Sequence, residues 1–176
     1  MSIGYVAVEQ FNQTRGENWN KYIEWSGLTH LKEVISLDGI LCPNLIKELS
    51  NEDWNYSLWE EDIYCFRDLN YLLKRIDHSK KYNILAVIKN PIIPFPHGFN
   101  DFDFEFIGYD LIEENGGISA LTNCGGFDNS FHRTDLSEYG LISDFQKAIE
   151  IKRLLKENNP EELHAICDLW VIWKKR

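Results

Sequence analysis

Four residues of this sequence have side chains that could share a catalytic reaction. Cys124 stands just before two glycines, and His132, His164 and Asp168 follow it along the chain. A thiolate forms near neutral pH only beside a base or a cation, so either histidine would serve as the base and the aspartate would orient it. The local sequences that mark known catalytic cysteines are missing, and two glycines are equally typical of a turn. A reactive Cys124 and a plain turn are therefore both kept as interpretations.

Metal and phosphate sites find little support in the same region. Only His164 and Cys167 are closely spaced among the potential ligands Cys124, His132, His164 and Cys167, and a structural zinc site normally has paired ligands on both sides. In an extended segment, positions three apart point to opposite faces. The glycine pairs have neither a nearby Lys or Arg nor the spacing of a phosphate-binding loop. We expect no metal and no cofactor.

Asp168 is the only polar residue between Ala165 and Trp173. An ionised carboxylate in such an apolar run is costly unless it is paired or hydrogen-bonded. If the run is a strand, His164 lies roughly 13 Å away, which is too far for a catalytic pair. A structural hydrogen bond and a functional cleft are the two interpretations of Asp168.

Aromatic and acidic residues form a second candidate site, for binding. They occur in the tryptophan-rich stretch from residue 54 and in and after a proline-rich loop, Asn90 to Asn100. Three prolines within six residues exclude a helix or a central strand from that loop. Aromatic anchors with a charged rim suit a protein partner, whereas the alternative is an ordinary solvated face over a buried Trp. The expected binding residues are Trp54, Trp59, Glu60, Glu61, Phe95, Phe99, Asp101 and Asp103.

Composition limits the class of partner. The chain has 176 residues, enough for one globular domain spanning 1–176, with no repeat or linker to suggest a second. Its 28 acidic residues outnumber 18 Lys and Arg, so the net charge of -10 repels nucleic acid and attracts a basic protein. Solvation alone is the competing explanation of the acidic excess. The aromatic content is high and serves either a core or a binding face.

Targeting signals and cysteine usage indicate the compartment. The opening residues have neither a basic leader nor an apolar run of signal-peptide length, and nowhere do about 18 apolar residues occur in succession. The four cysteines are scattered without a close pair, unlike the dense cysteines of small secreted domains. We expect a soluble, cytoplasmic protein with reduced cysteines and no membrane association.

Hydrophobic periodicity predicts an α+β fold. It consists of a mostly antiparallel sheet of five or six strands with three or four helices packed on it, and the C-terminal strand lies inside the sheet. A slip of the apolar phase at Gly108 predicts a β-bulge, and Asn115-Gly116 predicts a hairpin turn. The expected strands are 3–8, 33–41, 82–89, 102–113, 117–123 and 165–173. The expected helices are 14–26, 43–49, 61–77 and 143–158.

Two stretches, GYDLIEENGGISALTNCGGF and HAICDLWVIW, resemble a group of bacterial proteins without an established function. The resemblance extends over most of the chain. It implies a bacterial cytosolic origin, and it brings no catalytic motif and no site residue.

These observations favour a small acidic bacterial protein that acts by binding another protein. An immunity-type or antitoxin-like inhibitor that masks a basic toxin fits the charge, the size and the missing catalytic motifs. The alternative is a small-ligand binder or a cysteine-dependent enzyme with a cleft around Cys124 and Asp168. The sequence leans away from an enzyme.

Overall fold

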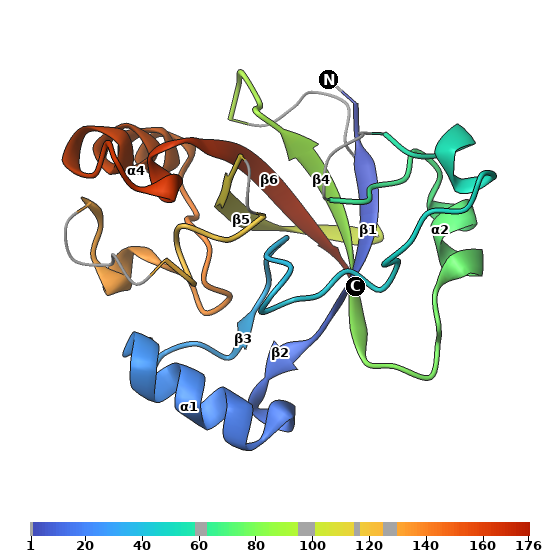
Figure 1. The fold of residues 1–176 in the computed structure, drawn as a ribbon, viewed down its shortest axis with the longest axis horizontal. Helices are drawn as coiled ribbons and strands as arrows, with labels where there is room; N and C mark the ends of the chain where they lie inside the picture. The colour runs from blue at the N-terminus through green and yellow to red at the C-terminus, as the bar shows by residue number, and fades with distance from the viewer. Residues whose placement is uncertain (1, 59–62, 95–100, 115–116, 125–129) are drawn as a thin grey trace.

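The computed structural model describes residues 2–58, 63–94, 101–114, 117–124 and 130–176. Its main element is a four-stranded antiparallel sheet in the order β1-β4-β6-β5 (Figure 1). These strands are β1 (Gly4–Glu9), β4 (Tyr82–Lys89), β6 (Cys167–Lys175) and β5 (Phe104–Glu113). A separate two-stranded sheet pairs β2 (Phe11–Asn12) with β3 (Glu33–Val34).

Three α-helices and four 3₁₀ turns accompany the sheets in the described part of the chain. The α-helices are α1 (Glu17–Ser26), α2 (Leu69–Arg75) and α4 (Phe145–Asn158). The 3₁₀ turns are η1 (Gln13–Arg15), η2 (Asp53–Asn55), η3 (Arg133–Asp135) and η4 (Leu163–Ala165). The predicted α+β fold is confirmed, although its strands divide between two sheets. None of the described helices has the length and apolar character needed to cross a membrane.

Local sequence signals explain where the helices begin and end. The side chains of Asp68 and Asp144 cap α2 and α4 by accepting hydrogen bonds from backbone N–H groups of the first turn. Gly27 ends α1 in the left-handed region at φ 68°, which costs glycine little because it has no Cβ. The predicted start at Thr14 is wrong by three residues, because η1 precedes α1.

The C-terminal strand β6 lies between β4 and β5, as predicted. Residues Leu169 to Trp173 are all buried, which explains why this stretch has no regular polar alternation. The predicted bulge is confirmed in β5, where the register shifts between Phe106 and Gly108. The predicted bounds of β4 are those observed.

Four predicted elements differ from the structure, and in the first three the cause is that side chains or distant strands bond to the backbone. The expected strand 33–41 ends at Val34, since the Asp38 side chain accepts the N–H groups of residues 40 and 41 and turns the chain. The expected helix 43–49 is absent, and its Pro43 and Leu45 bond to β1 instead. The expected helix 61–77 shrinks to α2, because Phe66 pairs with Tyr5.

Both outer strands of the main sheet are covered. Tyr5 exchanges two backbone hydrogen bonds with Phe66, and Ala7 and Glu9 bond to residues 45 and 43. On the other edge, β5 bonds to residues 118, 120 and 142. The expected return strand 117–123 is reduced to one bridge, Ile112 to Ser119, followed by a turn. Covered edges leave few free backbone groups for unwanted strand pairing.

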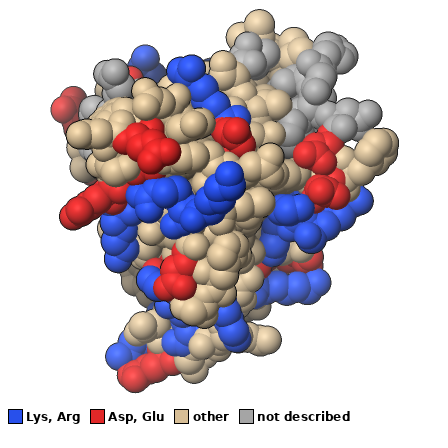
Figure 2. Space-filling view, turned by 90° about the vertical axis from the view of Figure 1, so that its right-hand side faces the viewer, with Lys and Arg blue, Asp and Glu red and all other residues tan. Residues whose placement is uncertain are grey.

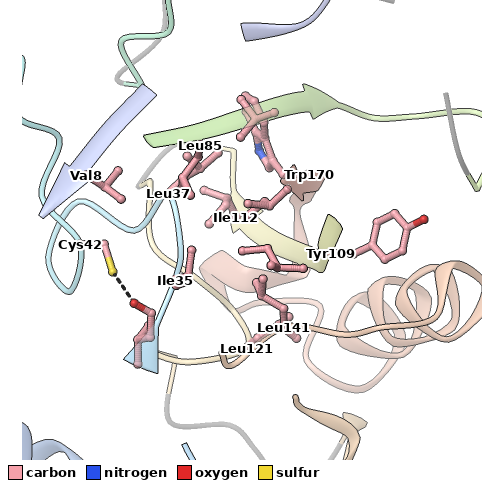
Figure 3. Packing of buried hydrophobic residues seen from close by; sticks show 14 of the residues in the cluster. Val8, Ile35, Leu37, Cys42, Leu85, Tyr109, Ile112, Leu121, Leu141 and Trp170 are labelled. Carbon is pink, nitrogen blue, oxygen red and sulfur yellow. Dashed lines mark hydrogen bonds between the residues drawn. The ribbon is translucent and has the colours of Figure 1, made fainter. Parts of the chain in front are cut away.

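The core lies on both faces of the sheet. Side chains alternate across β6, so Trp170 and Ile172 face one side while Val171 and Trp173 face the other. Figure 3 shows Ile112 beside Leu37 and Ile35, which come from the irregular segment after β3. The dashed line in the same view is the hydrogen bond from the Cys42 thiol to the Val34 carbonyl, 3.2 Å long.

Candidate functional site

Trp54 is large and apolar, yet half of its surface is exposed, at 50%. It lies in η2, and the fully buried residue before it, Asp53, fixes that turn. One carboxylate oxygen of Asp53 accepts both the backbone N–H and the hydroxyl of Ser50, at 2.7 and 2.8 Å. The other accepts the hydroxyl of Tyr71 at 2.7 Å. The exposed Trp54 side chain therefore lies on a turn that the hydrogen bonds of Asp53 hold in place.

Arg75 adds a two-pronged ion pair to the hydrogen bonds of Asp53. Its Nε and Nη2 donate to the two carboxylate oxygens of Asp53, at 2.7 and 2.8 Å. The guanidinium holds the pKa of Asp53 well below its usual range, against the opposing effect of burial. The bond to the same carboxylate raises the pKa of Tyr71 to about 12. Asp53 is thus ionised, and α2 and η2 are joined through it.

Tyr56 adds a second exposed ring. It stacks on Tyr71 with the ring centroids 3.9 Å apart and the planes 11° from parallel. We call Asp53, Trp54, Tyr56, Tyr71 and Arg75 the Trp54 platform. It presents two aromatic side chains on a base of hydrogen bonds, which suits an anchor for a partner protein.

The segment that carries the platform is acidic. Residues 47–68 contain seven Asp and Glu against two Lys and Arg, so their net charge of -5 is half of the -10 of the whole chain. Glu48 and Glu52 are exposed beside η2. Figure 2 faces the side of the molecule that carries α2, and red groups are interleaved there with blue ones. The face is therefore of mixed charge, and the acidic excess belongs to the segment 47–68 rather than to the whole face.

The second group of predicted binding residues is only partly described. Trp59, Glu60, Glu61, Phe95 and Phe99 lie outside the described residues. Asp101 and Asp103 are exposed, and Phe102 between them is 81% exposed.

The fold brings Asp101, one of the predicted binding residues, and Asp68, the cap of α2, toward one end of β1. Burial is the main cause of a raised pKa of Tyr5, and the charges of Asp101 and Asp68 add to it, so both carboxylates lie near that hydroxyl. The chain from Tyr56 reaches the same place, because its carbonyl accepts the N–H of Arg67 at 2.8 Å. A surface hollow of about 530 Å³ lies here, lined by Ser2, Ile3, Leu58 and Arg67.

Cys124 is half-buried and lies in the turn after the Ser119 bridge. Its thiol donates a hydrogen bond to the Ala120 carbonyl at 2.7 Å. A bond of this kind stabilises the protonated thiol, whereas a nucleophile needs the thiolate. Burial is the main cause of the raised pKa of Cys167, about 12, and the charges of Glu113 and Asp110 add to it.

The two candidate histidines have different surroundings. His132 is exposed, and its backbone N–H bonds to Asp135. His164 is buried in η4, and its carbonyl accepts the thiol of Cys167 at 3.0 Å. Its Nε2, like one oxygen of the buried Glu113, has no hydrogen-bond partner among the described residues. His164 thus lies beside Cys167, and it acts against the rise in the pKa of Glu113 that burial causes.

Asp168 has the paired environment that its apolar surroundings require. Lys89 approaches one carboxylate oxygen at 2.9 Å, and the amide of Asn90 donates to the other at 2.7 Å. This agrees with a structural hydrogen bond, and the carboxylate also lines a surface groove beside α4.

A network of buried polar side chains includes members of the segment 36–42. It was not predicted from the sequence. Asp110, fully buried in β5, accepts the hydroxyls of Ser36 and Ser119 at 2.5 and 2.7 Å. Asp38 accepts the Ser119 N–H and the Asn123 side chain at 2.9 and 3.0 Å. Burial raises the pKa of Asp110 to about 6, against the lowering effect of the two hydroxyls. The network joins segments that are far apart in sequence.

One sequence signal could have revealed part of this network. Asp110 interrupts the apolar run from Phe106 to Ile112 in the way that Asp168 interrupts the last strand. Its partner Ser36 could not have been found, since nothing in the spacing links residues 74 positions apart. Within the described ranges, no group of three or more His, Cys, Asp and Glu side chains is placed to hold a metal ion.

The chain matches no protein-family model, no curated protein and no solved structure.

Proposed function

We propose that this protein acts by binding a basic protein through the Trp54 platform and the acidic residues around it. The exposed Trp54 on its hydrogen-bonded base is the observation that carries the proposal. Interfaces draw most of their binding energy from a few aromatic or Arg side chains, and an anchor held in place before binding loses less conformational entropy. An immunity-type or antitoxin-like inhibitor of a basic toxin is the function of this kind that we favour.

Charge supports the class of partner. The net charge of -5 in residues 47–68 favours encounter with a basic surface, and such steering weakens as salt screens it. Asp53 is already neutralised by Arg75, so the attraction comes from the exposed carboxylates, Glu48 and Glu52 among the described ones.

A binding experiment with matched tryptophan variants tests the proposal. The probes are the basic proteins encoded by the neighbouring genes, and the affinity of each is measured by calorimetry at two salt concentrations. Trp54→Ala should weaken binding by about tenfold or more, the loss of roughly 1.4 kcal/mol or more expected of an anchor. Trp25→Ala is the control, because Trp25 is 54% exposed on α1, away from α2 (Figure 1).

Two results would contradict the proposal. One is no binding to any basic protein encoded beside the gene. The other is an equal effect of the two tryptophan variants, since this would show that the contact does not involve the Trp54 platform.

A further inference from the structure

A groove of about 460 Å³ lies between α4 and the residues that lead into β6. We call it the α4 groove. Its volume is within the range of small-molecule sites, which is roughly 300 to 1,000 Å³. It is lined by Glu114, Ile149, Lys152, Arg153, Lys156, Ala165, Ile166, Cys167 and Asp168.

Two lysines of the α4 groove have no ion-pair partner among the described residues. Lys152 and Lys156 are four positions apart, so they lie on one face of α4, where like charges repel each other. The hydrogen-bond acceptor of Lys152 within the described ranges is the side-chain carbonyl oxygen of Asn90, at 3.4 Å. Both lysines line the groove. An anion placed between them would remove their repulsion.

The other charges of the groove leave this positive character in place. Asp168 is already paired with Lys89 at 2.9 Å, and Arg153 is paired with Glu157. Glu114 is the carboxylate in the lining without an ion pair in the described part of the chain. Two lysines against one such carboxylate give a basic groove in a chain whose net charge is -10.

Apolar side chains make up the rest of the lining. Ile166 is 57% exposed and Ile149 is 41% exposed, although both could be polar at no cost to the core. Ala165 and Cys167 are buried below them. A ligand with a hydrocarbon part would cover the two isoleucines.

We propose that the α4 groove binds a small amphipathic anion, with its carboxylate or phosphate head between Lys152 and Lys156 and its hydrocarbon part against Ile149 and Ile166. This site is separate from the Trp54 platform and does not depend on the function proposed for it.

Titration of the full chain with defined probes, followed by amide NMR, tests this site. Octanoate and octyl phosphate carry the two possible heads, octanol lacks the charge, and acetate lacks the hydrocarbon part. Both octyl anions should shift the signals of residues 149–156 and 165–168 in a saturable way, and the tighter of the two identifies the head group. Octanol and acetate should bind at least about tenfold more weakly, since each loses one half of the contact.

Variants separate the groove from general surface binding. Replacing Lys152 and Lys156 by Gln should weaken octanoate binding by about tenfold or more, and Ile166→Ser should also weaken it. The control replaces Lys74 and Lys81, two exposed lysines outside the groove, by Gln and should leave binding unchanged. The proposal is overturned if neither octyl anion binds saturably, or if the two double variants bind octanoate equally.

Discussion

Two buried aspartates show how the partner decides the charge of a carboxylate. Asp53 faces the guanidinium of Arg75, which keeps its pKa well below the usual range. Asp110 is equally buried, but its partners Ser36 and Ser119 are neutral hydroxyls, and burial raises its pKa to about 6. Neutral donors compensate only part of the lost hydration of a charge.

The raised pKa of Asp110 predicts a specific pH dependence of stability. The folded state holds the proton more tightly than the unfolded state, whose carboxyl has the ordinary value of 3.8. The stabilising contribution is therefore complete below about pH 4 and is lost as the pH rises through 6. Its size is on the order of 3 kcal/mol, at about 1.4 kcal/mol for each pKa unit.

Urea unfolding of the wild type and Asp110→Asn between pH 4 and pH 7 measures this contribution. The advantage of the wild type over the variant should be largest at pH 4 and shrink toward pH 7, because the amide does not titrate. A difference between the two proteins that stays constant over this range would show that Asp110 ionises as an ordinary surface carboxyl does.

At the site, sequence reasoning found single residues better than their partners. The need of Asp168 for a partner followed from its apolar neighbours, but nothing in the spacing indicated Lys89 or Asn90. Trp54 was selected for its acidic surroundings, whereas the bonds of Asp53 to Tyr71 and Arg75 depend on the placement of α2. Contacts between segments that are distant in the sequence depend on the fold, and the local sequence pattern does not specify the fold.

At the scale of elements, the bulge in β5 depends on Gly108. The residue has φ 143°, where side chains are rarely accommodated. A Cβ there would lie 2.7 Å from the Cβ of Leu141 and 2.9 Å from the carbonyl oxygen of Ile142. The same carbonyl accepts the N–H of Tyr109. It therefore cannot move away without breaking a hydrogen bond that covers this edge of the sheet.

We expect Gly108→Ala to lower the free energy of unfolding by more than about 2 kcal/mol, because overpacking and backbone strain act together. Gly39→Ala is the matched control, since a Cβ at Gly39 meets nothing within 4 Å and φ there is not positive. The control should change stability by less than about 1 kcal/mol. Urea unfolding compares the two, and equal effects would contradict this role of Gly108.

Elements with a strong local signal could be predicted, and those built by tertiary contacts could not. The apolar run of β4 can be recognised from the local sequence alone, and so can the N-cap and the apolar stripe of α4. The stretch 43–49 reads as a helix after Pro43, but its backbone groups bond to β1. Likewise, Asp38 turns the chain after β3 through its own side chain. Local propensity is a weak guide wherever such bonds compete with it.

At the scale of the molecule, β6 holds the main sheet together. It pairs with β4 on one side and with β5 on the other, and no pairing joins β4 to β5 directly in the described sheet. Five successive residues of β6, 169–173, are buried, so both faces of the sheet pack against it. Loss of this strand would open the core and leave two unpaired edges.

We expect a chain that ends at Ile166 to lose cooperative unfolding, since it lacks β6. A chain that ends at Lys175 is the control and should keep a two-state transition with nearly the stability of the full protein. It loses the hydrogen bond from the N–H of residue 176 to Asp103. Far-UV circular dichroism during heating distinguishes the two. A sharp transition in the shorter chain would contradict a central role of β6.

The position of β6 in the order of synthesis has a consequence for the cell. The ribosome makes β4 and β5 well before β6, so each emerges with an edge of unpaired backbone N–H and C=O groups that β6 cannot yet cover. Growing chains with such edges are prone to aggregate, and long-range strand pairing is slow. We therefore expect the nascent chain to be prone to aggregate until residues 167–175 have left the ribosome.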